Sequence, residues 1–370
     1  MLISEAPPIR SGIARVADKL TTGLQDRGHQ VDVLSLQDIP RKEWGEVRLS
    51  TMLLKLPELK ERLPEYDLVH LHGPAPTFSD TFLLGGLRGL EKRPKLVYTH
   101  HAPVDLRHFP FRTATWLYNI SQEVMARLAD HVVVSTPSYR QRLARYVPPS
   151  KLSVIPWGVD FDKFAGPVEK PGPFTVLYLG QIRPYKGLPV LLDACAGLSG
   201  VRLWVIGKGH CEETCRRQAA NLGLEDVTFW GSVSDAELVA RLHEAHVLVL
   251  PSLTRSEAFG IARLEGMSAG CVPVTSDLPC DAGVVCNEGF TFPPGDVPAL
   301  CEAIVRLRDD PALRTHLAGV AKAKARLYSW ERVVFNYDRL FARLVAPPAA
   351  VEPGQRATAQ RALSSSSRGA

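Results

Sequence analysis

The sequence has no long hydrophobic run, no block of like charge and no secretory signal. None of its apolar segments approaches the roughly 18–20 residues that a membrane-spanning helix requires, so we expect no transmembrane segment. The N-terminus begins Met-Leu-Ile without a basic region and an apolar core, which excludes a signal peptide, and its short first strand would fit an upstream start codon. The net charge of +5 is spread along the chain, which disfavours a nucleic-acid partner.

Cysteine is present, but in a pattern that argues against disulfides and metal. All seven cysteines lie between Cys195 and Cys301. An odd number of cysteines without a secretory signal favours reduced thiols and a cytoplasmic location. His210, Cys211 and Cys215 lie close together, but a fourth ligand at normal zinc spacing is missing. We therefore expect no metal site.

Short β-branched runs alternate with amphipathic helical patterns, and this happens twice along the 370 residues. Such alternation predicts an α/β fold with parallel sheets, and the length suits two domains. The strands expected in the first half are 31–36, 68–71, 96–99 and 132–135, with helices over 13–27 and 115–129. Those expected in the second half are 176–179, 202–206, 227–229, 247–250 and 272–275, with helices over 188–196 and 235–245.

The domain boundary is predicted from a segment rich in proline and glycine, residues 166–173. It separates an N-terminal Rossmann-like domain, residues 1–165, from a C-terminal domain, residues 174–328. A last helix over 329–345 follows, and the Ala-, Pro- and Ser-rich residues 346–370 are expected to be a disordered tail. Two doubly wound domains imply a ligand cleft between the carboxyl ends of their sheets.

The segment 252–273 carries the most specific pattern in the chain. It follows a buried strand and places Glu257 and Glu265 eight residues apart, with a glycine-containing loop and a helix start between them. The positive end of a helix and its backbone N–H groups form a phosphate-binding layout. Carboxylates beside it are poor phosphate ligands but good acceptors for hydroxyl groups, so a sugar and a ribose are the expected ligands.

This segment resembles the Glu-x7-Glu motif of the retaining glycosyltransferases of family four, also called group 1. Their GT-B fold has two facing Rossmann-like domains. The resemblance covers roughly residues 1–345, with its pieces in the family's order. It implies that Glu257 contacts the hydroxyls of the sugar and Glu265 the ribose of the nucleotide. It also implies that the backbone amides of three further residues approach the sugar and diphosphate: Phe259, Gly260 and Ile261.

Two motifs of the first half also resemble the family. The segment P-P-I-R-S-G-I-A-R resembles its glycine loop, in which Gly12 permits close approach of the backbone. Ser11 replaces the usual first glycine and is equally well a helix N-cap. The strand end Y-T-H-H implies that His101 contacts the donor sugar, to position and polarise it. His72 ends another strand, although a lone histidine is more often a packed core residue.

The segment L-G-Q-I-R-P-Y-K-G resembles the family's diphosphate site. Lys186 matches the family lysine, which implies that it neutralises the leaving diphosphate. The family arginine is replaced, because Gln181 follows Gly180 and Arg183 lies two residues further on. Arg183 either compensates for this replacement or is simply exposed.

Further turns resemble the nucleotide site. The segment V-I-G-K-G implies that Gly207 and Gly209 lie at the nucleotide, and Val233 belongs to a loop that lies against the base in the family. Trp157 replaces an asparagine of the family pattern and either presents an aromatic surface to the cleft or simply packs. The segments 105–112 and 113–119 follow His101 and contain aromatic residues; they are a candidate wall for the acceptor or, equally, a packed lid.

The resemblance implies a retaining hexosyltransferase that uses a nucleotide-diphosphate sugar as donor. UDP-sugars are favoured as donor and a small soluble hydroxyl compound as acceptor, as in antibiotic (aminoglycoside-like) or glycoconjugate biosynthesis. No Asp-x-Asp motif is placed for the donor, so neither a metal nor a tightly bound cofactor is expected. The alternatives are a glycosyltransferase of cell-envelope polysaccharide or glycolipid, a nucleotide-sugar epimerase and a non-catalytic nucleotide-binding protein. The segments 52–55 and 116–118 would suit a lipid acceptor but are equally well ordinary amphipathic helix faces, so peripheral membrane contact stays open.

Overall fold

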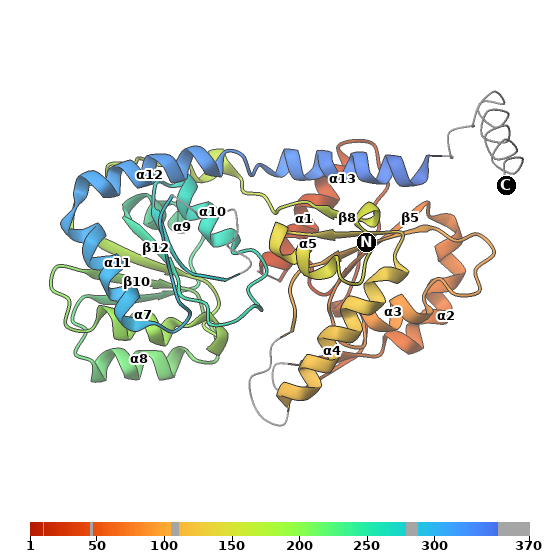
Figure 1. Cartoon of the computed structure of the whole chain (residues 1–370), viewed down its shortest axis with the longest axis horizontal. Coiled ribbons are helices and arrows are strands. Elements are labelled where there is room, and N and C mark those ends of the chain that lie inside the picture. Colours follow the sequence, from red (N-terminus) through yellow and green to blue (C-terminus); the bar gives the residue numbers. More distant parts are fainter. Residues whose placement is uncertain (10, 45–46, 105–110, 279–287, 347–370) are drawn as a thin grey trace, which may run out of the picture.

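The structure is a computed structural model that describes residues 1–9, 11–44, 47–104, 111–278 and 288–346. Residues 105–110 of the predicted acceptor wall and residues 347–370 of the predicted tail therefore lie outside the described residues. The described chain forms two α/β lobes, each built around a six-stranded sheet, with the last two helices running along one side of both (Figure 1).

The N-terminal sheet has the strand order β2-β1-β5-β6-β7-β8, and every neighbouring pair is parallel. Its strands are β1 (Leu2–Ile3), β2 (Leu34–Ser35), β5 (Leu68–Gly73), β6 (Lys95–His100), β7 (His131–Val134) and β8 (Leu152–Val154). A separate antiparallel hairpin joins β3 (Arg41–Trp44) to β4 (Val47–Ser50). The helices of this lobe are α1 (Gly12–Gln25), α2 (Met52–Arg62), α3 (Ser79–Gly85), α4 (Phe111–Met125) and α5 (Pro137–Leu143).

The C-terminal sheet has the order β11-β10-β9-β12-β13-β14, again parallel throughout. Its strands are β9 (Thr175–Leu179), β10 (Arg202–Ile206), β11 (Val227–Gly231), β12 (Val247–Leu250), β13 (Val272–Ser276) and β14 (Phe290–Phe292). The order reverses between β9 and β12, which is where open α/β sheets bind ligands. The helices are α6 (Phe161–Phe164), α7 (Leu188–Cys195), α8 (Glu212–Asn221), α9 (Asp235–Glu244), α10 (Ile261–Ser268), α11 (Val297–Asp309) and α12 (Pro311–Ala325).

These two doubly wound sheets confirm the predicted fold class. The strand expected over 31–36 is wrong in extent, because only Leu34–Ser35 pairs with β1. Ser35 instead caps a 3₁₀ turn: its N–H donates to Asp38 over 2.7 Å and its hydroxyl accepts from the Gln37 N–H. The sequence also misses β8 and β14, which have three residues each.

Helix α13 (Trp330–Val345) leaves the C-terminal lobe and packs on α1 of the N-terminal lobe (Figure 1). The approach is close at Gly23, where a Cβ would lie 2.5 Å from a methyl of Val334. Before the helix begins, the N–H of Val159 donates to the carbonyl of Tyr328 over 2.7 Å. One buried core runs through both lobes at this place, so the crossing helix ties them together.

Candidate active site

The carboxyl ends of the two sheets meet at a junction between the lobes. The loop after β12 contacts the N-terminal lobe there: the hydroxyl of Ser135 donates to the carbonyl of Ala258 over 3.1 Å. The hydroxyl of Tyr139 donates to the carbonyl of Glu257 over 3.1 Å. Residues of both lobes therefore fix the backbone that carries the first glutamate of the motif.

Lys186 and Glu257 form a buried ion pair at this junction. The Lys186 Nζ lies 2.5 Å from Glu257 Oε2, and the hydroxyl of Ser252 donates to the same oxygen over 2.8 Å. Burial alone would raise the pKa of Glu257, but Lys186 and the two hydrogen bonds outweigh it, and the pKa is lowered. Burial would lower the pKa of Lys186, but Glu257 outweighs it, and the pKa is raised. Both groups are therefore charged at neutral pH.

Glycine makes this pairing possible. Gly187 has φ 69°, and a Cβ on it would lie 1.9 Å from the carbonyl oxygen of Pro251. The turn after β9 (η5, Pro184–Lys186) can therefore press against the loop after β12, on either side of the point where the strand order reverses. This contact brings Lys186 beside Glu257, although they are 71 residues apart in the sequence.

Helix α10 begins directly after Gly260, whose φ of 73° favours glycine. The side chains of Phe259 and Ile261 are buried, so only their backbone groups are candidates for ligand contact. An α-helix leaves its first N–H groups without internal partners and carries a positive partial charge at that end. The helix start that the sequence analysis expected after Gly260 is therefore present, and its role in binding phosphate stays a prediction.

Glu265 lies in the second turn of α10, is only 3% exposed and forms an ion pair with Arg15 of α1. The sequence analysis assigned no role to Arg15. The available signal was its position one turn after Gly12 on the same helix. A Cβ on Gly12 would lie 3.6 Å from Trp157 and 3.8 Å from Ile261. The predicted glycine loop and the start of α10 are thus brought together.

The turns after β9, β10 and β11 are bonded to one another. The N–H of Gly180 donates to the carbonyl of Ile206 over 3.0 Å, and the N–H of Gly207 donates to the carbonyl of Gly231 over 2.8 Å. A Cβ on Gly207 would lie 1.9 Å from the carbonyl oxygen of Gly180. A Cβ on Gly209 would lie 2.1 Å from the carbonyl oxygen of Ile182, in the turn after β9. These glycines therefore permit close packing of backbones, apart from any contact with a nucleotide.

The other predicted residues of this region have different surroundings. The carbonyl of Gln181 accepts from the hydroxyl of Tyr178 over 2.9 Å. Arg183 is the N-cap residue of η5, the 3₁₀ turn that ends at Lys186. It forms no ion pair with any residue that the structure describes. Val233 is partly buried against the core that joins the lobes.

His101 follows β6 and is 5% exposed. The backbone N–H of His101 donates to the carbonyl of Gly73 over 2.8 Å. Its ring packs edge-on against Trp157 at 5.1 Å between centroids. Burial and the neighbouring His100 lower the pKa of His101 to about 3, so the ring is neutral at physiological pH. His101 Nε2 lies 3.0 Å from Nδ1 of His72, so these two predicted candidates are in contact.

Comparison with known proteins assigns the chain to a family. The models "Glycosyltransferase Family 4" and "Glycosyl transferases group 1" match residues 10–163 and 160–324. The D-rhamnosyltransferase WbpZ of Pseudomonas aeruginosa is 32% identical over 283 residues, 73% of this chain and 71% of its own. The chain belongs to the group 1, or family 4, glycosyltransferases.

One further relative and one solved structure are similar to this glycosyltransferase. The GDP-mannose:cellobiosyl-diphosphopolyprenol alpha-mannosyltransferase of Xanthomonas campestris is 32% identical over 299 residues, 76% of this chain and 75% of the relative. The sucrose-phosphate synthase of Thermosynechococcus elongatus superimposes with a TM-score of 0.74 at 21% identity, covering 90% of this chain and 94% of the other. The predicted GT-B fold and transferase class are confirmed.

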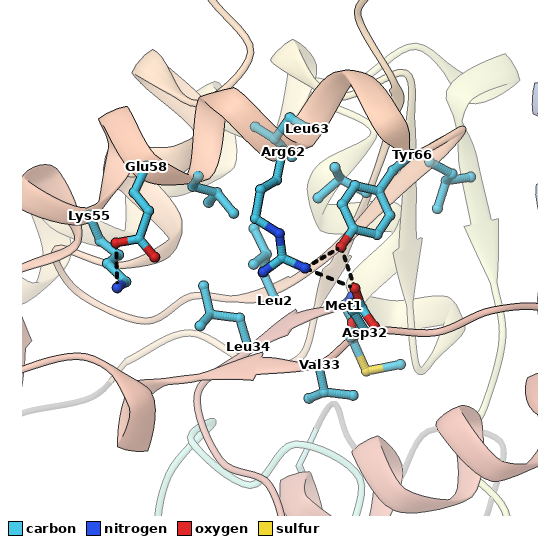
Figure 2. A pocket seen from close by; sticks show the side chains of 13 residues that line it. Met1, Leu2, Asp32, Val33, Leu34, Lys55, Glu58, Arg62, Leu63 and Tyr66 are labelled. Carbon is cyan, nitrogen blue, oxygen red and sulfur yellow. Dashed lines mark hydrogen bonds and ion pairs between the residues drawn. The ribbon is translucent and has the colours of Figure 1, made fainter.

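One pocket of this glycosyltransferase lies away from the junction. Its volume is about 110 Å³, and it is lined by Met1, Leu68 and Val69, at the amino ends of their strands. Figure 2 shows Arg62 and Tyr66 directed at Asp32 on its wall, and the Arg62 Nη2 lies 3.2 Å from the Asp32 carboxylate. Ligands of such sheets bind at the opposite, carboxyl ends, so this pocket is not the predicted site.

In the described part of the glycosyltransferase, no group of three or more histidine, cysteine or acidic side chains is arranged to hold a metal ion. The same residues include no helix with the length and apolar character needed to span a bilayer.

Proposed function

We propose that this glycosyltransferase transfers a mannosyl or related hexosyl group from a guanosine diphosphate sugar to a lipid-linked acceptor of a cell-envelope glycan. The buried Lys186–Glu257 pair beside the start of α10 carries the proposal, because it combines a fixed cation, a carboxylate and backbone donors. The relatives' names supply the donor and acceptor class, since one names GDP-mannose and a diphosphopolyprenol and the other a rhamnosyl transfer. They favour the cell-envelope alternative over the UDP-sugar and small soluble acceptor that the sequence analysis put first.

Each site residue has a chemical role in this proposal. Glu257 accepts hydrogen bonds from the sugar hydroxyls, and Glu265 accepts them from the ribose. Lys186 and the N–H groups at the start of α10 stabilise the diphosphate as it leaves. Arg183 forms no ion pair with the described residues. It would supply a second cation and so compensate for the family arginine that Gln181 replaces.

The proposed reaction needs no protein side chain as a base. The acceptor oxygen bonds to the anomeric carbon while the bond from that carbon to the diphosphate oxygen breaks. The departing diphosphate keeps the electron pair and takes the acceptor's proton on the same face of the sugar, so the anomeric configuration is retained. His101, buried and neutral, would position the sugar and not act as nucleophile.

The donor is tested by calorimetric titration with GDP, UDP and TDP, followed by transfer assays with GDP-mannose and UDP-glucose on a diphosphopolyprenol-linked saccharide. We expect GDP to bind at least about tenfold more tightly than UDP, a difference of about 1.4 kcal/mol, and GDP-mannose to be the better donor. Tighter binding of UDP would reject the guanosine assignment. An altered sugar nucleotide formed without acceptor would instead favour the epimerase alternative.

Three neighbouring helices of the N-terminal lobe expose large apolar side chains. Leu53 and Leu54 on α2 are 68% and 79% exposed, and Leu84 on α3 is 61% exposed. Trp116 and Leu117 on α4 are 61% and 56% exposed. Helix α3 packs against both α2 and α4, and the three helices lie together in the N-terminal lobe (Figure 1). A surface of this kind suits the interface of a membrane that carries a lipid-linked acceptor.

The double variant Leu54→Ser/Trp116→Ser tests this membrane contact. We expect it to float with phosphatidylglycerol-containing vesicles several-fold less than the wild type, because two apolar side chains no longer enter the interface. Leu327→Ser is the matched control, since Leu327 is 59% exposed but lies beside α13. Equal flotation of all three proteins would reject this surface as the membrane contact.

A further inference from the structure

Glu265, the predicted ribose ligand, is covered by the opposite lobe. Its side chain is only 4% exposed, and its Oε1 forms an ion pair with Nη1 of Arg15 on α1. Beyond this ion pair, Oε1 has no hydrogen-bond partner among the described residues. Helix α1 lies on the side of the N-terminal lobe toward α10 (Figure 1), where a Cβ on Gly12 would lie 3.8 Å from Ile261.

This cover decides whether a ribose can reach Glu265. A hydroxyl must come within about 3.0 Å of the oxygen that accepts its hydrogen bond. The covered carboxylate offers almost no surface for two hydroxyls to approach while Arg15 holds it. Because an ionised carboxylate only accepts hydrogen bonds, the guanidinium N–H groups and the ribose O–H groups compete for the same oxygens.

The Arg15 side of the ion pair is much more open than the Glu265 side. The side chain of Arg15 is 35% exposed. Burial lowers the pKa of Arg15, and Asp160 and Asp235 are close enough to oppose that effect. A displaced Arg15 would therefore keep water and acidic side chains around it. The main cost of breaking a buried ion pair, an unpaired buried charge, is avoided on this side.

The next basic residue of α1 makes a comparable contact away from the predicted site. Lys19 lies one turn after Arg15, and its Nζ lies 2.9 Å from Oδ1 of Asp160, the residue before α6. The two side chains are about one-third exposed, so this pair is open to solvent on both sides. Of these two ion pairs of α1, only that of Arg15 occupies a residue predicted to bind the nucleotide.

We propose that Arg15 competes with the ribose of the donor for Glu265. It holds the carboxylate before the nucleotide binds, leaves it when the ribose arrives, and returns as the nucleoside diphosphate departs. The inference rests on the ribose role of Glu265 in the proposed function. Its consequence is that Arg15 weakens the binding of nucleotide and favours release of the spent diphosphate. The buried carboxylate in turn always keeps a hydrogen-bond donor, which avoids the cost of an unpaired charge.

The test is calorimetric titration of the full chain with GDP and with 2′,3′-dideoxy-GDP, which lacks both ribose hydroxyls. Arg15→Ala is expected to bind GDP at least about fivefold more tightly than the wild type, the size of a modest coupling between two sites. Stopped-flow measurement should show the gain as slower dissociation of GDP. The dideoxy compound should show no gain, because it offers no hydroxyl to the freed carboxylate. Arg15→Gln, which keeps most of the side-chain stem, should behave as Arg15→Ala does.

Lys19→Ala is the matched control, because it removes an ion pair of the same helix without uncovering Glu265. We expect it to bind GDP as the wild type does. Equal or weaker binding of GDP by the folded Arg15 variants would overturn the proposal and leave Arg15 as a residue that orients Glu265. An equal gain with the dideoxy compound, or the same gain in Lys19→Ala, would also overturn it, because looser lobes would then explain the result.

Failure of the proposed function would look different. If the wild type binds UDP in place of GDP, the same comparison is made with UDP and its dideoxy form, and only the guanosine assignment is lost. Nucleotide binding by Glu265→Ala that equals the wild type would reject the ribose role, and this inference with it. Weaker binding by Glu265→Ala together with no gain in Arg15→Ala would reject this inference alone.

Discussion

Replacing Lys186 with alanine is expected to lower the turnover of this glycosyltransferase by a factor on the order of 100 or more. The Lys186 Nζ lies 2.5 Å from Glu257, is charged at neutral pH and stands beside the start of α10. A fixed cation at this place is available to the diphosphate as negative charge develops on it. The measurement is single-turnover transfer at saturating donor, which excludes effects on product release.

The same substitution leaves Glu257 buried without its cation. Breaking a buried ion pair from one side typically costs about 3–5 kcal/mol of unfolding free energy, so the rate must be compared on protein shown to be folded by circular dichroism. Lys163→Ala is the matched control, since its pair with Asp235 is exposed and such pairs are worth less than about 1 kcal/mol. A near-normal rate in folded Lys186→Ala would transfer the leaving-group role to Arg183.

The sequence predicts those parts of the molecule that have a local or family-specific signal. Runs such as Val247–Leu250 are long enough to be recognised as buried strands, and they were confirmed. Strands of three residues, such as β8 and β14, are too short to show a periodicity and depend on pairing with their neighbours. That Lys186 and Glu257 belong to one site was implied only because both residues matched motifs of one family, and their direct contact was not predicted.

Contacts between distant segments had no such signal. Arg15 reaches Glu265 because α1 and α10 meet at the junction, and neither residue reveals the other in the sequence. Tyr337 reaches Thr99 because α13 crosses to the other lobe. The sequence left His72 open between a packed core residue and a site residue. The structure shows it buried and in contact with His101, and its site role stays untested. Such roles depend on the arrangement of the lobes and not on any one motif.

Removing the carboxylate of Glu265 is expected to weaken binding of GDP at least about tenfold. A hydrogen bond to a charged group contributes about 1.5–3 kcal/mol, and the ribose offers two hydroxyls to this carboxylate. The variant is Glu265→Ala, measured by calorimetry, and the control is Glu302→Ala, whose carboxylate is exposed on α11. Unchanged affinity for GDP in folded Glu265→Ala would reject the ribose role.

The ion pair with Arg15 provides a second explanation that has to be separated from the first. Without Glu265, the half-buried Arg15 loses its partner and could enter the nucleotide site or disturb the contact between the lobes. A double-mutant cycle with Arg15→Ala distinguishes the two effects. If Glu265 binds the ribose, the double variant stays at least about as weak as Glu265→Ala, because the acceptor for the hydroxyls is still missing. If affinity for GDP returns in the double variant, the single substitution acted through the freed arginine, and the ribose must be held by other groups.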